Sequence, residues 1–117
     1  AAADLGLAPY NAAYYPPLSQ FGFFWSPLKI FEYMASGRTT LTTDYPPLRE
    51  ILGPAGGLLL PEGDLAAYGA AIASLSQDRA LGQLIGQAAR KRVVARFTWE
   101  KHAQQLDALL HNLTSAA

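Results

Sequence analysis

Cysteine is absent from this chain of 117 residues, so disulfide bonds and cysteine-based metal sites are excluded. Histidine is almost as scarce, because His102 and His111 are the two in the chain and they are isolated from one another. A histidine metal site is therefore not expected, and no metal cofactor is predicted. The lack of thiols does not fix the compartment, although a reducing cytoplasm is compatible with it.

Charge is sparse and evenly balanced. Charged side chains make up 15% of the residues, and nine basic residues offset nine acidic ones. This balance favours neither nucleic acid nor a membrane as a partner. The one concentration of charge, Arg90-Lys91-Arg92 with Arg96, is interpreted as a solvated helix face in preference to a binding patch for an anionic surface. No apolar run approaches the roughly 20 residues that a membrane span needs.

The composition that remains is that of a globular domain. Half of the residues are hydrophobic, and the length fits one small domain on a prior of roughly 100 to 200 residues. The chain has no initiator methionine and begins at the first residues of a predicted strand. We therefore expect it to be part of a longer protein.

Three short segments with strand character alternate with helical segments, which predicts parallel strands joined by right-handed crossovers. The strands are expected at Leu5–Ala8, Thr39–Thr43 and Gly57–Leu60. The threonines of the second strand suit it through β-branching, but they predict a strand wetter than a valine-rich one. The expected fold class is α/β, a three-stranded parallel sheet with flanking helices.

Helices are expected over residues 27–36 and Pro46–Leu52, with Asp44 as a candidate cap of the second and Gly53 as its end. Asp64, Asp78 and Thr98 predict three further helices as N-caps. Each of these carries an apolar stripe at helical spacing, which predicts a face buried in the core. The stripes comprise Leu65, Tyr68, Ile72 and Leu75, then Leu81, Leu84, Ile85 and Ala88, then Trp99, Ala103, Leu106, Leu109, Leu110 and Leu113.

The helix over residues 27–36 has the features of an anion site. Ser26 is a good N-cap, Pro27 fits the first helical position, and Gly37 supplies the end. Free backbone N–H groups and the positive end of the helix dipole would then meet Lys29, and Glu32 lies three residues on. A phosphate and a hydroxyl donor could be bound there side by side.

The segment before this helix is rich in aromatic residues. Such a loop near the carboxyl end of a parallel strand is where ligands usually bind, so Tyr10, Phe24 and Trp25 are candidate pocket residues. The alternative is that the rings cover an exposed sheet face or pack against a missing N-terminal domain. The full set of rings is Tyr10, Tyr14, Tyr15, Phe21, Phe23, Phe24 and Trp25.

The order of these motifs resembles the C-terminal, donor-binding domain of retaining GT-B glycosyltransferases, the group 1 or family 4 type. The motifs are the strand at residues 3–10, the Ser-Pro-Leu-Lys helix start, Gly56-Gly57-Leu58-Leu59-Leu60-Pro61-Glu62-Gly63-Asp64, and Arg96-Phe97-Thr98-Trp99-Glu100. The resemblance covers about residues 3–110. It implies half of a Rossmann-like domain, with strand-helix repeats over residues 3–64 and C-terminal helices over residues 65–113.

The resemblance also implies roles for individual residues. Glu32 matches the glutamate that hydrogen-bonds the ribose hydroxyls of a nucleotide sugar, and Ser26, Leu28 and Lys29 match the diphosphate-binding turn. The family's other glutamate would stand where this chain has Phe24, which puts recognition of the sugar hydroxyls in doubt. The chain contains no Asp-x-Asp pair, in agreement with a transfer that stabilises the leaving diphosphate without a metal.

Taken together, these features predict a fragment of a glycosyltransferase that uses a nucleotide-sugar donor with retention and is inactive alone. We expect a cytoplasmic location, and peripheral contact of the parent protein with a membrane stays open. The expected partners are a nucleotide sugar and the missing N-terminal domain, and no nucleic acid is expected to bind. Half a sheet leaves one face and one edge uncovered, so self-association is also expected. The alternatives are a non-enzymatic half-Rossmann binding or assembly module that has lost donor binding and, more remotely, a flavodoxin-like domain.

Overall fold

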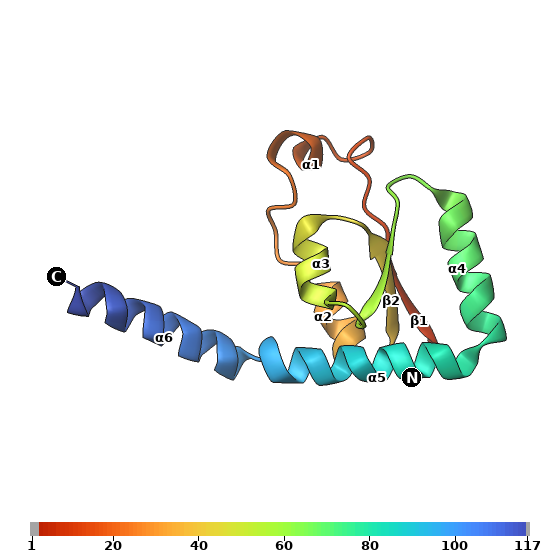
Figure 1. Ribbon diagram of the computed structural model, residues 1–117. Helices are drawn as coiled ribbons and strands as arrows, with labels where there is room; N and C mark the ends of the chain where they lie inside the picture. Colours follow the sequence, from red (N-terminus) through yellow and green to blue (C-terminus); the bar gives the residue numbers. More distant parts are fainter. Residues whose placement is uncertain (1–2, 117) are drawn as a thin grey trace.

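The computed structural model describes residues 3–116, and the predicted fold class is confirmed. Its elements are β1 (Leu5–Ala8), α1 (Pro16–Phe21), α2 (Leu28–Ala35), β2 (Thr39–Thr43), α3 (Pro46–Leu52), β3 (Gly57–Leu60), α4 (Leu65–Gln77), α5 (Arg79–Arg96) and α6 (Trp99–Ser115). The strands form one parallel sheet in the order β1-β2-β3. All three strands run in one direction, so their carboxyl ends meet at one edge, the upper edge in Figure 1.

Helices cover the two faces of the sheet unequally. On one face, α2 packs so close to β1 that a Cβ on Gly6 would lie 2.3 Å from the Tyr33 ring. The core on that side contains the fully buried Ile30 and Met34. On the other face lies α4 (Figure 1), but Leu7 of the edge strand β1 stays 46% exposed. One strand edge and part of one face are therefore left uncovered by residues 3–116.

The expectation that β2 is a wet strand is wrong. Its threonines, Thr39, Thr40, Thr42 and Thr43, are each at most 1% exposed. Three of their hydroxyls find backbone acceptors on neighbouring segments, namely the carbonyl oxygens of Gly82, Ala8 and Tyr10. A buried hydroxyl costs little when it is hydrogen-bonded, so threonine serves here as a core residue.

The start of α2 differs from the prediction, whereas its end agrees with it. Pro27 takes the N-cap position, and its φ of −82° and ψ of 74° make an inverse γ-turn in which the Ser26 carbonyl accepts from the Leu28 N–H. Ser26 is therefore not the cap. At the other end, Gly37 has a φ of 69° and donates to the Met34 carbonyl, a Schellman-type end.

The helix α1 falls within a segment that the sequence indicated as loop. Pro16 and Pro17 occupy its first positions, where the missing proline N–H costs nothing. A second correction concerns Asp44, which does not cap α3. Its carboxylate instead pairs with Arg49, with 3.0 Å between Nη2 and Oδ2, and the pair holds the pKa of Asp44 below its usual range.

The three carboxylate and hydroxyl caps predicted for the C-terminal helices are confirmed. Asp64 accepts from the Ala67 N–H, Asp78 from the Leu81 N–H, and Thr98 from the Lys101 N–H. Asp78 also ends α4, so one residue forms the corner between two helices.

The basic run on α5 is only partly a solvated face. The Arg90 guanidinium donates to the Ala35 carbonyl at the end of α2. Arg92 donates to the carbonyls of Glu50 and Ile51 at the end of α3, at 2.6 and 2.8 Å. Cations are favoured at helix C-termini, so α5 closes the ends of two helices, while Lys91 between them is exposed.

The apolar stripe of α6 is not buried in this chain, contrary to prediction. No residue of this helix is buried, and Figure 1 shows it extending away from the sheet. On α4 and α5, too, several predicted core residues are exposed, among them Leu65 at 83% and Leu84 at 65%. The prediction of buried faces therefore holds for Leu75 on α4, but it is wrong for α6 and for much of the stripes on α4 and α5.

Candidate functional site

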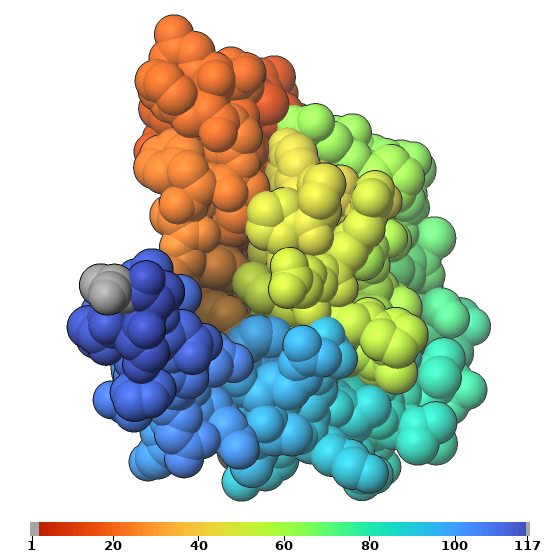
Figure 2. Space-filling model, turned by 60° about the vertical axis from the view of Figure 1, so that its left-hand side comes forward, coloured from red at the N-terminus to blue at the C-terminus, as the bar shows by residue number. Residues whose placement is uncertain are grey.

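The loops at the carboxyl edge of the sheet bring the predicted site residues into one region. Residues 9–27 connect β1 to α2 and form the raised segment, coloured orange, at the top of Figure 2. No charged side chain occurs in residues 5–28. A ligand in contact with this segment therefore meets aromatic and neutral polar groups, and the first charged side chain after it is Lys29 in the first turn of α2.

The first turn of α2 has fewer free backbone donors than the sequence predicted. The N–H groups of Leu28, Ile30 and Phe31 already donate to the carbonyls of Ser26 and Pro27. Within residues 3–116 the Lys29 N–H has no backbone partner. An anion at this turn would thus depend on the Lys29 amide, the Lys29 ammonium and the helix dipole.

The four predicted donor-binding residues do not all face the same way. Residues 9–27, the aromatic loop, include Tyr10, and the Lys29 ammonium lies 5.8 Å from the centre of the Tyr10 ring. Ser26 and Leu28 instead line a cavity of about 390 Å³ between α2 and the α5–α6 junction, together with Arg96 and His102. Glu32 is exposed on α2 and forms no ion pair within the described residues.

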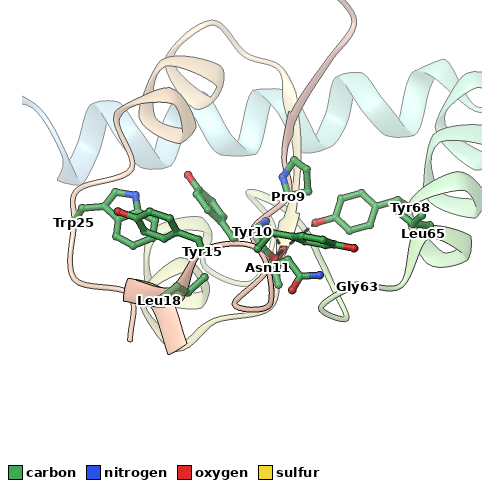
Figure 3. Close-up of a pocket in the computed structure, with 11 residues that line it drawn as sticks. Pro9, Tyr10, Asn11, Tyr15, Leu18, Trp25, Gly63, Leu65 and Tyr68 are labelled. Atoms are coloured by element: carbon green, nitrogen blue, oxygen red, sulfur yellow. Dashed lines mark hydrogen bonds between the residues drawn. The ribbon is translucent and has the colours of Figure 1, made fainter. Parts of the chain in front are cut away.

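A larger cavity, of about 500 Å³, lies between the aromatic loop and the start of α4. Of the three residues expected at a pocket, Tyr10 and Trp25 line this aromatic pocket, whereas Phe24 does not and is 60% exposed. Figure 3 shows Tyr68 reaching from α4 towards Pro9 and Asn11. The complete lining is Pro9, Tyr10, Asn11, Tyr14, Tyr15, Leu18, Trp25, Thr43, Gly63, Leu65 and Tyr68.

Sequence reasoning missed Thr43 and Tyr68 as pocket residues, since Tyr68 was assigned to a core stripe. The Tyr68 hydroxyl lies 3.2 Å from Thr43 Oγ1, which also bonds both backbone polar groups of Tyr10. Burial raises the pKa of Tyr68, and the Thr43 hydrogen bond offsets part of that rise. A usable signal existed: Thr43 ends β2 and Tyr68 lies in the first turns of α4, both at the carboxyl edge.

Tyr10 forms the wall between the aromatic pocket and the start of α2. Its ring packs edge-on against Phe23 and Trp25, with centroid distances of 5.0 and 5.7 Å. Burial raises the pKa of Tyr10, and the nearby Trp25 indole offsets part of the rise. The hydroxyl itself is buried without a well-formed hydrogen bond among the described residues.

A carboxylate clamp holds the aromatic loop to the rest of the edge. Glu62, between β3 and α4, accepts from the Ala12 N–H of the loop and from the Tyr45 hydroxyl at 2.6 Å. These bonds lower the pKa of Glu62, with the Tyr45 bond as the larger cause. Desolvation and then the Glu62 carboxylate raise the pKa of Tyr45 to about 12.

The hydrogen bonds of the Glu62 carboxylate are expected to weaken in acid, which should loosen the aromatic loop. Because the folded pKa of Glu62 is lowered from 4.5, its contribution is complete above that value and is lost as the pH falls through the folded pKa. Trp25 stacks on Phe23 with 4.3 Å between the ring centroids, so its fluorescence reports changes in the aromatic loop. In a Trp99→Phe background, we expect a step in Trp25 emission below about pH 4.5. Glu62→Gln should remove the step, Asp44→Asn should retain it, and an identical step in Glu62→Gln would contradict the assignment.

Residues 3–116 hold no cluster of three or more His, Cys, Asp or Glu side chains suited to a metal ion. Among the helices of the same residues, none has the length and apolarity to cross a bilayer.

The parallel α/β sheet with its flanking helices is structurally similar to part of a GT-B glycosyltransferase. Sucrose-phosphate synthase from Thermosynechococcus elongatus matches this chain with a TM-score of 0.72 and 31% sequence identity. The match covers 82% of this chain and 24% of that one. This chain therefore spans about a quarter of the length of that enzyme.

The family model described as "Glycosyl transferase-like" matches residues 11–108. The chain belongs to this family. A comparison with curated proteins gave no match.

Proposed function

We propose that this chain is the distal half of the donor-binding domain of a glycosyltransferase that uses a nucleotide-diphosphate sugar. In this proposal residues 1–117 form a partial nucleotide-sugar-binding domain, with strand-helix repeats over residues 3–64 and C-terminal helices over residues 65–113. The whole protein acts in the cytoplasm, with room for peripheral membrane contact, belongs to the retaining group 1 or family 4 type and needs no metal. We expect residues 1–117 to show no transfer on their own, because the proposed reaction also needs a domain that binds the acceptor.

The observation that carries the proposal is the start of α2 at the carboxyl edge of a sheet of this family. Lys29 is a cation in the first turn of a helix, where the dipole disfavours it by a few tenths of a kcal/mol, and an anionic ligand offsets that cost. Glu32 is exposed and free of ion pairs within residues 3–116. In the proposal, Glu32 accepts from the ribose hydroxyls, while Ser26, Leu28 and Lys29 hold the diphosphate.

The split orientation of these residues refines the proposed contacts. Lys29 faces Tyr10, whereas Ser26 and Leu28 face the cavity that Arg96 and His102 also line. A diphosphate at the helix start would lie between the two sides, with Arg96 as a second cation within the same region. Phe24 stands where the family's sugar-binding glutamate would stand, so the sugar hydroxyls depend on other groups.

Calorimetric titration of the full chain with UDP, GDP and ADP tests the proposal, and at least one is expected to bind saturably. Each charge-assisted bond from Glu32 to a ribose hydroxyl contributes roughly 1.5 to 3 kcal/mol, so Glu32→Ala should weaken binding by at least about tenfold. Lys29→Ala should weaken it as well. Glu50→Ala and Lys91→Ala, which alter exposed residues on α3 and α5, serve as matched controls.

Two outcomes would contradict the donor-binding proposal. One is the absence of saturable binding with all three nucleotides. The other is a Glu32→Ala variant whose dissociation constant equals that of Glu50→Ala, with circular dichroism showing both to be folded.

A second candidate function, an assembly module, is favoured by the exposed stripe of α6. Leu106, Leu109, Leu110 and Leu113 are between 49% and 63% exposed along one helix, and leaving such a stripe in water costs about 25 cal/mol per Å² of apolar surface. We propose that the chain self-associates through this stripe when no other domain covers it.

Light scattering coupled to size exclusion tests the assembly proposal. The unchanged chain is expected to form dimers or larger species at high concentration, and Leu109→Glu with Leu113→Glu should shift it to monomer. His111→Glu, a change of similar size elsewhere on the same helix, is the control. A clean monomer for the unchanged chain at high concentration would refute the proposal.

A further inference from the structure

The aromatic pocket has a lining that does not match a nucleotide sugar. No charged side chain takes part in it, and its rings are Tyr10, Tyr14, Tyr15, Trp25 and Tyr68. A phosphate requires cations or free N–H groups, and a sugar requires many hydrogen-bonding partners. Lys29, whose ammonium lies 5.8 Å from the centre of the Tyr10 ring, does not line the cavity.

Several polar groups of the lining are already used within the chain. Thr43 Oγ1 bonds the backbone N–H and carbonyl of Tyr10 at 2.7 Å each, with the Tyr68 hydroxyl at 3.2 Å. The Asn11 side-chain carbonyl accepts from the Ala13 N–H at 2.8 Å. What remains for a ligand is the Asn11 amide group, some tyrosine hydroxyls and a large apolar surface.

The walls of the pocket are held in place before any ligand arrives. Trp25 is fixed by stacking on Phe23 at 4.3 Å and by an edge contact with Tyr15 at 5.6 Å. The Glu62 clamp ties the aromatic loop to the start of α4. A rigid cavity of about 500 Å³ lies within the usual range for small-molecule sites, about 300–1,000 Å³.

We infer that the aromatic pocket binds an uncharged aromatic or alicyclic ring system. Flat rings pack against the faces and edges of Trp25, Tyr15 and Tyr68, an arrangement that aromatic side chains favour over contact with water. The Asn11 amide can donate to a single carbonyl or hydroxyl on the ring. This site is separate from the proposed nucleotide contacts at Lys29 and Glu32, so it extends the proposed function and does not depend on it.

The uncharged fluorescent probe N-phenyl-1-naphthylamine tests the inference with the full chain. In a Trp99→Phe background, saturable binding is expected together with energy transfer from Trp25, which locates the probe. Leu65→Glu places a carboxylate at the first position of α4, where a negative charge suits the helix and the side chain is 83% exposed. It should weaken probe binding about tenfold, because a charge at an apolar site is costly.

Matched variants separate this site from nonspecific apolar surface. Leu84→Glu makes the same substitution on α5, where the leucine is 65% exposed and lies outside both the aromatic pocket and the α6 stripe, and it should leave probe affinity unchanged. Equal weakening by Leu65→Glu and Leu84→Glu, or the absence of energy transfer from Trp25, would overturn the inference.

Nucleotide competition distinguishes this inference from the proposed function. Saturating UDP is expected not to displace the probe, and Glu32→Ala should alter nucleotide binding alone. Competitive displacement of the probe by UDP would show that the pocket belongs to the nucleotide site and would overturn the inference while supporting the proposed function. Probe binding without any nucleotide binding would support the inference and contradict the proposed function.

Discussion

Replacing Gly86 with alanine is expected to destabilise the fold by about 2 to 3 kcal/mol, at the upper end of the cost of overpacking. Helix α5 crosses the end of α2 at this glycine, and a Cβ there would lie 2.0 Å from the Gly37 carbonyl oxygen and 2.8 Å from its carbon. The atoms in the way are backbone atoms, which no rotamer change can move. The turn at Gly37, with its φ of 69°, would have to shift as a unit.

Gly82 on the same helix provides the control. A Cβ at Gly82 would meet Leu75 Cδ2 at 3.8 Å and Thr39 Oγ1 at 4.0 Å, which is ordinary contact. Because alanine is a better helix former than glycine by about 1 kcal/mol, Gly82→Ala should be neutral or stabilising. Urea unfolding of both variants measures the difference. Equal midpoints for the two variants would show that the close approach at Gly86 is not a constraint.

Replacing Arg92 with methionine is the second change with a large expected effect, a loss of about 3 kcal/mol. Its guanidinium donates to the carbonyls of Glu50 and Ile51 and fills the space beside Gly53, where a Cβ would lie 2.5 Å from Cζ. Methionine retains the aliphatic stem but leaves both carbonyls without their partner. The end of α3 would then lose its closure, since no other described side chain donates to these two carbonyl oxygens.

Lys91→Met is the control for this prediction, because Lys91 is the neighbouring basic residue and is exposed. It removes the same charge without removing a cap. Thermal or urea unfolding should give Arg92→Met a clearly lower free energy of unfolding than Lys91→Met. Similar free energies would mean that the hydrogen bonds of Arg92 make no net contribution to stability. The Arg92 contact with the Phe97 ring, at 6.0 Å, would be lost in the same variant.

Most of the fold follows from local signals in the sequence. The three strands, the caps at Asp64, Asp78 and Thr98, and the glycine end of α2 are each determined by a few neighbouring residues, and all are as predicted. The errors arise where the burial of a residue depends on a partner that is distant in the sequence. Thr39 and Thr42 can be buried because their hydroxyls donate hydrogen bonds to the carbonyls of Gly82 and Ala8, and no local sequence pattern predicts such a partner.

The site was predicted less completely than the fold, for a related reason. Spacing identified Lys29 and Glu32 on one helix, but only the packing of the chain separates Ser26 and Leu28 from Lys29. The γ-turn at Pro27 removed donors that a standard cap would have left free. Tyr68 lines the aromatic pocket because it lies in the first turns of α4, which begins at the carboxyl edge, a position that its helical period alone does not reveal.

The stacked rings of residues 9–27 have a consequence for the thermodynamics of ligand binding. A loop that becomes ordered only when its ligand binds gives up about 1–2 kcal/mol of backbone entropy for each residue it fixes, and its affinity falls accordingly. Here the Phe23–Trp25 stack and the Glu62 clamp order the loop when the chain folds. Binding at this edge should therefore carry a small entropic penalty, and its strength should track the stability of the folded chain.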